Sequence, residues 1–191
     1  HNGTDLSTIS KIEPFKHEFL NDTDVVWCCS SRWTNRPNKR LKDNVDYFLE
    51  NADHEHAEKM IVIGPDSNGA IKNNSILYLG NITWEECISV YKRANYFVHL
   101  AFVDHCPNVV IDARACGCQI TCASCSGTKE IAGFGGVIVK DMDWNMKDPI
   151  DVKHPPELDF CKIEHCLKDS DISIEHVAEQ YIGVFQNVKM V

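Results

Sequence analysis

The stretch from Tyr96 to Gly117, which reads YFVHLAFVDHCPNVVIDARACG, decides the fold. It begins with an apolar run of strand length and continues through a polar loop at Asp104. Pro107 suits the first turn of a helix, because its missing N–H costs nothing there, and Gly117 is a common residue at a helix end. The stretch therefore predicts a strand, a loop and a short helix, in that order.

Apolar runs of strand length recur on both sides of this stretch. The predicted strands are Val25 to Ser30, Met60 to Gly64, Ile76 to Leu79, Tyr96 to Ala101, Gln119 to Ala123 and Gly136 to Val139. Most are continuously apolar, as is typical of parallel strands covered on both faces. Amphipathic stretches between them predict helices over Lys39 to Ala52 and Trp84 to Ala94, the second behind a capping box at Thr83 and Glu86. We expect an α/β fold, a Rossmann-like doubly wound parallel sheet flanked by helices.

The 191 residues, 43% of them hydrophobic, predict a single domain. Residues 1–24 precede the core, residues 25–140 form the sheet and its helices, residues 141–172 form an irregular proline-containing segment, and residues 173–189 form a C-terminal helix. Ser173 is the expected cap of that helix. Because the chain begins at His1 without the pattern of a signal peptide, we interpret it as a fragment of a longer protein.

Composition limits the classes of partner. A formal net charge of −9 argues against nucleic acid and against anionic membrane surfaces, so we expect a small-molecule partner. We interpret the ten cysteines as reduced thiols of a cytoplasmic protein. Cys28 and Cys29 are expected on opposite faces of a strand. The alternative is a zinc or thiol protein organised on Cys116, Cys118, Cys122 and Cys125.

The predicted helix after Pro107 offers a site for an anion. Its first backbone N–H groups, those of Asn108 and Val109, and the positive end of its dipole face the carboxyl edge of the sheet, where a phosphate could bind. At 1.5 Å of rise per residue, Asp112 lies about 7 Å along the axis from Pro107, which suits a ribose beside a diphosphate. The alternative is that Asp112 is a solvated helix residue and that Asp104 simply begins a turn.

The same stretch resembles the acidic motif of family-4 retaining glycosyltransferases, in which two glutamates are separated by seven residues. Asp104 and Asp112 have this spacing. The resemblance covers the chain to about Lys140. Its other motifs are His1 to Asp5, Val25 to Arg32 with Lys39, Met60 to Gly64, Ile76 to Ile82 and Ser126 to Ile131. It implies the C-terminal, donor-binding half of a two-domain GT-B enzyme, in which residues 1–24 follow the inter-domain linker and the N-terminal acceptor domain is absent from this chain.

The resemblance also implies roles for individual residues. Arg32 and Lys39 fall where the family places a basic pair for the donor diphosphate, and with Asp104, on the sugar side, they form the expected catalytic set. Arg36, Arg40 or Lys42 could substitute in the basic pair. The expected donor-binding residues are Asp112, Asn108, Val109, Gly127, Thr128 and Ile82.

Several of these positions have a plainer interpretation. Gly127 and Thr128 could form an ordinary turn from a strand into a helix. Ile82 could be a hydrophobic staple in front of the capping box. We interpret His99 as a sheet residue and His105 as a loop residue near the donor.

The implied reaction is transfer of a hexose, with retention, from a UDP or GDP sugar to a saccharide, lipid or protein acceptor. No metal and no cofactor is expected, because cations and the helix dipole neutralise the diphosphate. The fragment alone should not turn over, and the full-length enzyme should be cytoplasmic or peripheral to a membrane. Aspartate replaces glutamate at both acidic positions, so the sugar geometry should differ. The alternatives are a nucleotide-sugar epimerase of the same architecture and a catalytically inactive nucleotide-binding module.

Overall fold

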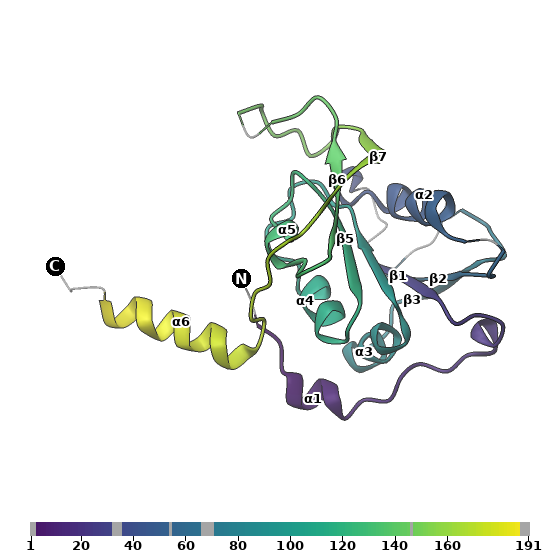
Figure 1. Ribbon diagram of the computed structural model, residues 1–191, viewed down its shortest axis with the longest axis horizontal. Helices are drawn as coiled ribbons and strands as arrows, with labels where there is room; N and C mark the ends of the chain where they lie inside the picture. Colours follow the sequence, from purple (N-terminus) through teal and green to yellow (C-terminus); the bar gives the residue numbers. More distant parts are fainter. Residues whose placement is uncertain (1–2, 32–35, 54, 66–70, 146, 188–191) are drawn as a thin grey trace.

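The computed structural model describes residues 3–31, 36–53, 55–65, 71–145 and 147–187. Within these residues one sheet has the order β3-β2-β1-β4-β5-β6-β7, in which β1 to β6 are parallel and β7 is antiparallel (Figure 1). The strands are β1 (Val26–Ser30), β2 (Lys59–Ile63), β3 (Ile76–Gly80), β4 (Tyr96–His99), β5 (Gln119–Ala123), β6 (Val137–Asp141) and β7 (Leu158–His165). The predicted fold class is confirmed, and the six predicted strands are all present.

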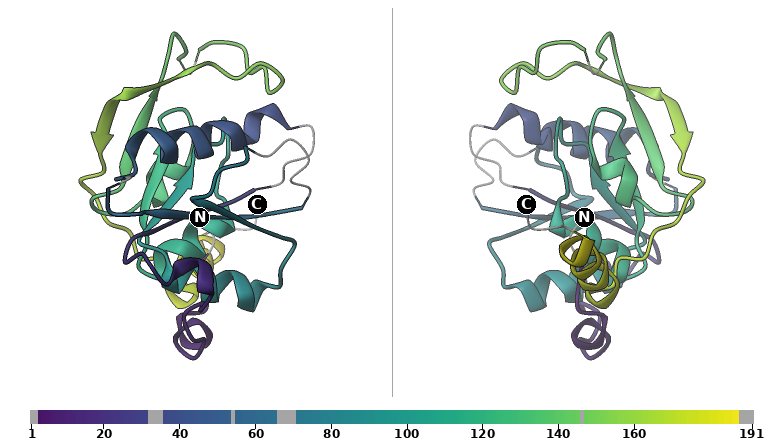
Figure 2. Two further views of the ribbon diagram at one scale, coloured as in Figure 1. Left: turned by 90° about the vertical axis from the view of Figure 1, so that its right-hand side faces the viewer. Right: turned by 90° about the vertical axis from the view of Figure 1, so that its left-hand side faces the viewer.

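Helices cover both faces of the sheet. The α-helices are α1 (Leu6–Ser10), α2 (Leu41–Asn51), α3 (Trp84–Arg93), α4 (Asn108–Ala115), α5 (Thr128–Ile131) and α6 (Ile174–Asn187), and the 3-10 helices are η1 (Glu18–Leu20) and η2 (Pro37–Lys39). Figure 2 shows the sheet nearly edge-on, with α2 on one side and α3 on the other. The apolar stripes predicted over Lys39 to Ala52 and Trp84 to Ala94 therefore face the sheet from opposite sides.

Successive strand residues belong to two separate cores. Cys28 packs with Ile88 and Tyr91 of α3, whereas Cys29 packs with Val45 and Phe48 of α2. Side chains of a strand alternate between its faces, and this alternation fills both cores from β1. The expectation that Cys28 and Cys29 occupy different environments is confirmed.

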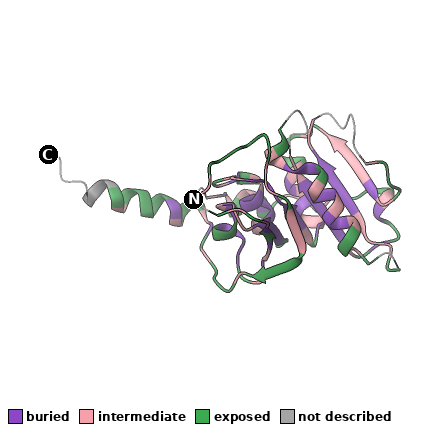
Figure 3. Ribbon diagram, turned by 90° about the horizontal axis from the view of Figure 1, so that it is seen from above, coloured by how far each residue is buried: buried purple, intermediate pink, exposed green. Residues whose placement is uncertain are grey.

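The predicted helix beginnings at Thr83 and Ser173 are also confirmed. The Thr83 hydroxyl accepts from the Glu86 N–H at 3.2 Å, and the Glu86 carboxylate accepts from the Thr83 N–H at 2.7 Å. The Ser173 hydroxyl accepts from the His176 N–H at 3.3 Å. Beyond Ser173, α6 extends away from the sheet, and much of it is exposed (Figures 1 and 3). No helix in the described ranges combines the length and the apolar character that crossing a bilayer requires.

The expectation of an irregular segment over residues 141–172 is wrong in two places. Asp141 ends β6, and β7 (Leu158–His165) pairs with β6 in antiparallel register, Asp141 opposite Leu158. Strand β7 lies at the edge of the sheet and is partly or fully exposed along its length, so it lacks the continuous apolar run that marks a buried strand. Residues 1–24, which were expected only to precede the core, contain α1, which begins where the Asp5 carboxylate accepts from two backbone N–H groups.

Candidate functional site

A cavity of about 440 Å³ opens at the carboxyl ends of β1, β2 and β4. The sheet order runs outward in opposite directions from β1 and β4, and in open α/β sheets ligands bind beside such a reversal. Its volume is in the range of small-molecule sites. The residues that line it include five of the expected catalytic and donor-binding residues, namely Ile82, Lys39, Asp104, Asn108 and Val109.

Helix α4 supplies one wall of the cavity with its N-terminal end. Pro107 is the N-cap, and no side chain caps the helix there. The first N–H groups of a helix have no intrahelical acceptor, and they carry the positive end of the dipole. The sequence placed Pro107 inside the helix by one residue, but the predicted direction of the helix toward the cavity is correct.

Asp104 is the central charged group of the cavity. Its Oδ2 lies 2.6 Å from Nζ of Lys39 and 3.0 Å from Nε2 of His99. An ionised carboxylate only accepts hydrogen bonds, so Nε2 of His99 carries the donated proton. Burial alone would raise the pKa of the Asp104 carboxyl, but the hydrogen bonds from His99 and Lys39 hold it well below its ordinary value. Asp104 is therefore a fixed negative charge, and no described residue donates to its Oδ1.

His99 is a site residue that the sequence did not identify. It ends β4, as expected of a sheet residue, yet it lines the cavity and is only 3% exposed. Its position at the carboxyl end of a parallel strand, five residues before Asp104, was the signal that could have found it.

The loop that carries Asp104 is held at several points. Phe102 donates its N–H to the carbonyl of Asn38 at 2.7 Å, and Leu100 donates its N–H to Oδ1 of Asn44 at 2.8 Å. Ser126 donates its hydroxyl to the carbonyl of Asp104 at 2.7 Å. Residues of η2, α2 and the loop after β5 thus fix the backbone of the loop that carries the Asp104 carboxylate.

Gly127 and Thr128 lie behind this loop and are not among the described residues that line the cavity. A Cβ on Gly127 would lie 2.4 Å from the carbonyl oxygen of His105, so only glycine allows the two backbones to approach this closely. The buried hydroxyl of Thr128 lies 2.7 Å from that of Ser126. Both residues support the Asp104 loop from behind, at the turn into α5.

Asp112 does not line the cavity in the described part of the chain. Its Oδ1 accepts from the Thr4 hydroxyl at 2.6 Å, and its Oδ2 accepts from Nε1 of Trp84 at 3.0 Å. It is 9% exposed, so the alternative of a solvated helix residue is wrong. The carboxylate joins α4 to the N-terminal segment and to the beginning of α3.

The expected basic pair is described only in part. Lys39 lines the cavity, whereas Arg32 lies outside the described residues. Of the possible substitutes, Arg36 lines the cavity, Arg40 is buried against Asp141, and Lys42 is paired with Asp46 on the surface of α2. Among the described cations, Lys39 and Arg36 are therefore the two that can reach a ligand there.

The zinc or thiol alternative finds no support in the geometry. In the described ranges, no group of three or more His, Cys, Asp or Glu side chains is placed to hold a metal ion. Burial raises the pKa of the Cys116, Cys118, Cys122 and Cys125 thiols to about 12, which is the reverse of what a reactive thiol needs.

Comparison with known families decides the membership. A family model described as "Glycosyl transferases group 1" matches residues 24–147, more than half of the chain and all of the sheet up to β6. The chain belongs to the group 1 glycosyl transferases. No curated protein sequence gives a significant match.

Solved structures of glycosyltransferases share the fold of this group 1 domain. Sucrose-phosphate synthase from Thermosynechococcus elongatus is similar with a TM-score of 0.55 at 16% identity, over 74% of this chain and 39% of that one. HepE from Anabaena, in complex with UDP and glucose, has a TM-score of 0.55 at 16% identity, over 73% and 42%. The trehalose-6-phosphate synthase OtsA has a TM-score of 0.53 at 12% identity, over 67% and 37%. The chain thus spans about two fifths of these structures.

Proposed function

We propose that this group 1 glycosyl transferase domain binds a nucleoside diphosphate sugar in the cavity, and that the longer enzyme transfers the hexose with retention. The observation that carries the proposal is the convergence of a cationic side chain, a carboxylate and a helix N-terminus on one cavity. Lys39 ends η2, whereas Asp104 and Asn108 belong to the loop after β4 and to the first turn of α4, and all three line the same space at the carboxyl edge of the sheet.

The diphosphate has the best-defined place in this cavity. The N-terminal end of α4 presents N–H groups and a positive dipole, and Nζ of Lys39 lies on the same cavity. During transfer, negative charge grows on the leaving nucleoside diphosphate, and preorganised donors stabilise it without reorganisation. We assign Lys39, Arg32 and the α4 N–H groups of Asn108 and Val109 to this role, and we propose that no metal takes part.

The sugar lies next to Asp104 in this arrangement. Oδ2 of Asp104 already accepts from Lys39 and His99, which leaves Oδ1 of Asp104 to accept from a sugar hydroxyl. An aspartate reaches one methylene less far than a glutamate, so the hydroxyl must approach the loop more closely. Support for Gly127 and Thr128 as donor residues is indirect, through the loop they hold behind Asp104.

We propose a base pocket at Ile82 and a ribose site toward Asp112. Ile82 lines the cavity and offers an apolar surface after β3. Asp112 lies one helical turn beyond Asn108, and each carboxylate oxygen has a second lone pair beyond the one used by Thr4 or Trp84. UDP is the first donor nucleotide to test, because the similar HepE structure is a complex with UDP and glucose.

The acceptor, a saccharide, lipid or protein, would bind to a second domain that this chain does not include. The chain covers about two fifths of the similar glycosyltransferase structures, so we propose that the fragment binds donor without turning it over. We place the enzyme in the cytoplasm, which the ten free cysteines favour.

Calorimetric titration of the chain with UDP, GDP and ADP tests the donor site directly. One nucleotide should bind, and Lys39→Ala should weaken it while Lys42→Ala, at an exposed lysine on α2, should not. Failure of all three nucleotides to bind, or equal affinity for the parent and Lys39→Ala, would remove the site assignment. With the longer protein, product analysis separates sugar transfer from epimerisation, which needs no acceptor.

A further inference from the structure

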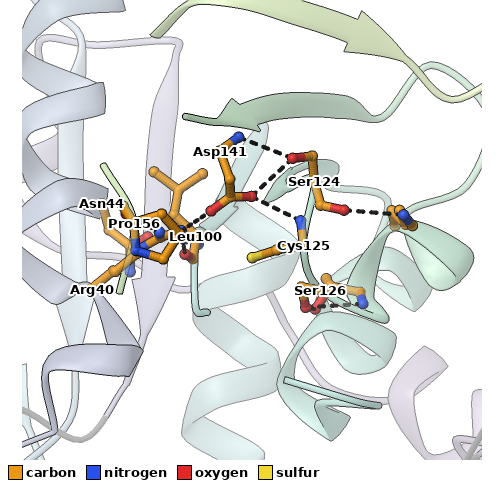
Figure 4. A network of polar contacts seen from close by, with 10 residues as sticks. Arg40, Asn44, Leu100, Ser124, Cys125, Ser126, Asp141 and Pro156 are labelled. Atoms are coloured by element: carbon orange, nitrogen blue, oxygen red, sulfur yellow. Dashed lines mark hydrogen bonds and ion pairs between the residues drawn. The ribbon is translucent and has the colours of Figure 1, made fainter. Parts of the chain in front are cut away.

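Asp141 lies outside the cavity, yet its two carboxylate oxygens bond to residues that adjoin both partners of the Lys39–Asp104 pair. Its Oδ1 accepts from Nη1 of Arg40 at 2.7 Å, and Arg40 directly follows Lys39. Its Oδ2 accepts from the N–H of Cys125 at 2.8 Å (Figure 4). Cys125 directly precedes the serine whose hydroxyl holds the carbonyl of Asp104.

We propose that Asp141 is a positioning residue of the donor site, which sets the Lys39–Asp104 pair through Arg40 on one side and Cys125 on the other. The inference rests on the proposed function for its consequence, but its geometry stands on its own. No described atom of Asp141 lines the cavity, so its effect on a ligand passes through these neighbours.

The Arg40 side of this arrangement leaves little freedom. Arg40 lies between η2 and α2 in the left-handed backbone region, at φ 48° and ψ 44°, where residues other than glycine are disfavoured. Its guanidinium donates to Asp141 and to the carbonyls of Leu100 and Pro156, and it lies over the ring of Phe102. These contacts hold Arg40 in a backbone conformation that is otherwise disfavoured. They thereby fix the direction in which the Lys39 side chain points.

The Cys125 side is held equally closely. Oδ2 of Asp141 also accepts from the Ser124 hydroxyl at 2.9 Å, and that hydroxyl accepts in turn from the Asp141 N–H at 2.9 Å. Residues 124 and 125 are therefore tied to the end of β6. Ser126 follows, and its bond to the carbonyl of Asp104 carries the constraint to the loop in the cavity.

Only a carboxylate can serve both sides at once. Donors face Oδ1 from Arg40 and Oδ2 from Cys125 and Ser124, and both side chains of the ion pair are almost fully buried, 2% exposed for Arg40 and 1% for Asp141. An asparagine would present an NH₂ group to one of these donor sets. A buried ion pair is often no better for stability than apolar packing, so its value here lies in the geometry that it fixes.

Asp141→Asn tests the proposal with two readouts. The first readout is the NMR chemical shift of the Asp104 carboxyl carbon, measured as a function of pH. The signal is assigned by its loss in Asp104→Asn. In the parent we expect the Asp104 carboxyl to stay ionised well below its ordinary pKa, and in Asp141→Asn its pKa should rise toward the ordinary range because Lys39 is no longer held against it. The second is UDP affinity, expected to fall roughly tenfold, since small misplacements of a binding group are costly.

Asp46→Asn is the matched control, because it breaks the exposed pair with Lys42 on α2 and should change neither readout. A folded Asp141→Asn whose Asp104 titration and UDP affinity equal those of the parent overturns the proposal.

If Asp141→Asn does not fold, Arg40→Lys replaces it: the charge is kept, but an ammonium cannot hold Asp141 and both carbonyls together. The same two shifts are expected, and their absence is equally decisive. A parent that binds no UDP contradicts the proposed function alone, because the Asp104 titration still decides the role of Asp141.

Discussion

Nζ of Lys39 lies 2.6 Å from Oδ2 of Asp104, across 65 residues of sequence. The two side chains are 24% and 17% exposed, so the contact is neither buried nor freely solvated. It joins the segment before α2 to the loop after β4. The candidate donor site is thus assembled from the ends of separate elements, and two of its charges, those of Lys39 and Asp104, are paired with each other.

Replacing Lys39 by Met should weaken nucleotide binding far more than it weakens the fold. A hydrogen bond to a charged group contributes about 1.5–3 kcal/mol, which corresponds to a loss of roughly tenfold to a hundredfold in affinity. The partly exposed ion pair contributes about 1 kcal/mol or less to folding. Calorimetry with UDP and urea unfolding measure the two effects. Lys42→Met is the control, and an equal loss of affinity in both variants would contradict a specific role for Lys39.

The Asp104 carboxylate should make the stability of the chain sensitive to acid. Its pKa is lowered in the folded state, against an opposing effect of burial, by His99 and Lys39. A depressed folded pKa stabilises the fold above the unfolded pKa, and that contribution is lost as the pH falls below the ordinary value of 3.8 toward the folded one. We expect the free energy of unfolding of the parent to exceed that of Asp104→Asn at neutral pH, and the difference to shrink below that value.

Urea unfolding of both proteins at a series of pH values measures this difference. Asp53→Asn is a suitable comparison, because the pKa of Asp53 is also lowered, by a hydrogen bond from His56, but at an exposed position, where solvent screening should make the difference in stability smaller. A difference between parent and Asp104→Asn that stays constant into acid would show that His99 and Lys39 do not stabilise the ionised carboxylate.

The sheet was predictable because buried parallel strands leave continuous apolar runs. The run Gln119 to Ala123 gives β5 with the predicted bounds, and the capping box at Thr83 marks the beginning of α3 to the residue. Strand β7 was not predictable in this way, since this edge strand is partly exposed over its first three residues and exposed over the remaining five. The sequence patterns that predict an element come from local burial and local hydrogen bonds, and β7 has little buried surface.

The pairings around the site could not be inferred from sequence. The bond from Thr4 to Asp112 spans 108 residues, and that from Arg40 to Asp141 spans 101. The family resemblance singled out Asp104 and Asp112, but it could not show that one faces the cavity and the other faces Thr4 and Trp84. Such contacts depend on how distant elements pack, and a single sequence carries no record of that packing.

Gly127→Ala should destabilise the chain and disturb the Asp104 loop. The added Cβ would lie 2.4 Å from the carbonyl oxygen of His105, and backbone atoms on both sides would have to separate. Overpacking of this kind costs about 1–3 kcal/mol. We expect lower stability in urea together with weaker UDP binding.

Gly183→Ala is the opposite case, because no atom in the described part of the chain outside the helix backbone lies within 4 Å of the added Cβ in α6. Helix propensity predicts a gain of up to about 1 kcal/mol there, with UDP binding unchanged. If the two alanine variants behaved alike, the close approach of Gly127 to His105 would have no energetic weight.

Asp112 can be tested for its two possible roles with one pair of ligands. Asp112→Ala leaves the Thr4 hydroxyl and the Trp84 N–H without their acceptor, so we expect a loss of about 1–3 kcal/mol in unfolding free energy. If the carboxylate also accepts from the ribose, the parent should bind UDP more tightly than 2′-deoxy-UDP, and Asp112→Ala should bind the two equally. Trp84→Phe serves as the control, because it removes one structural partner and leaves the carboxylate in place. A preference for UDP that survives in Asp112→Ala would make Asp112 a residue of the fold alone, and the ribose would have to be recognised elsewhere in the cavity.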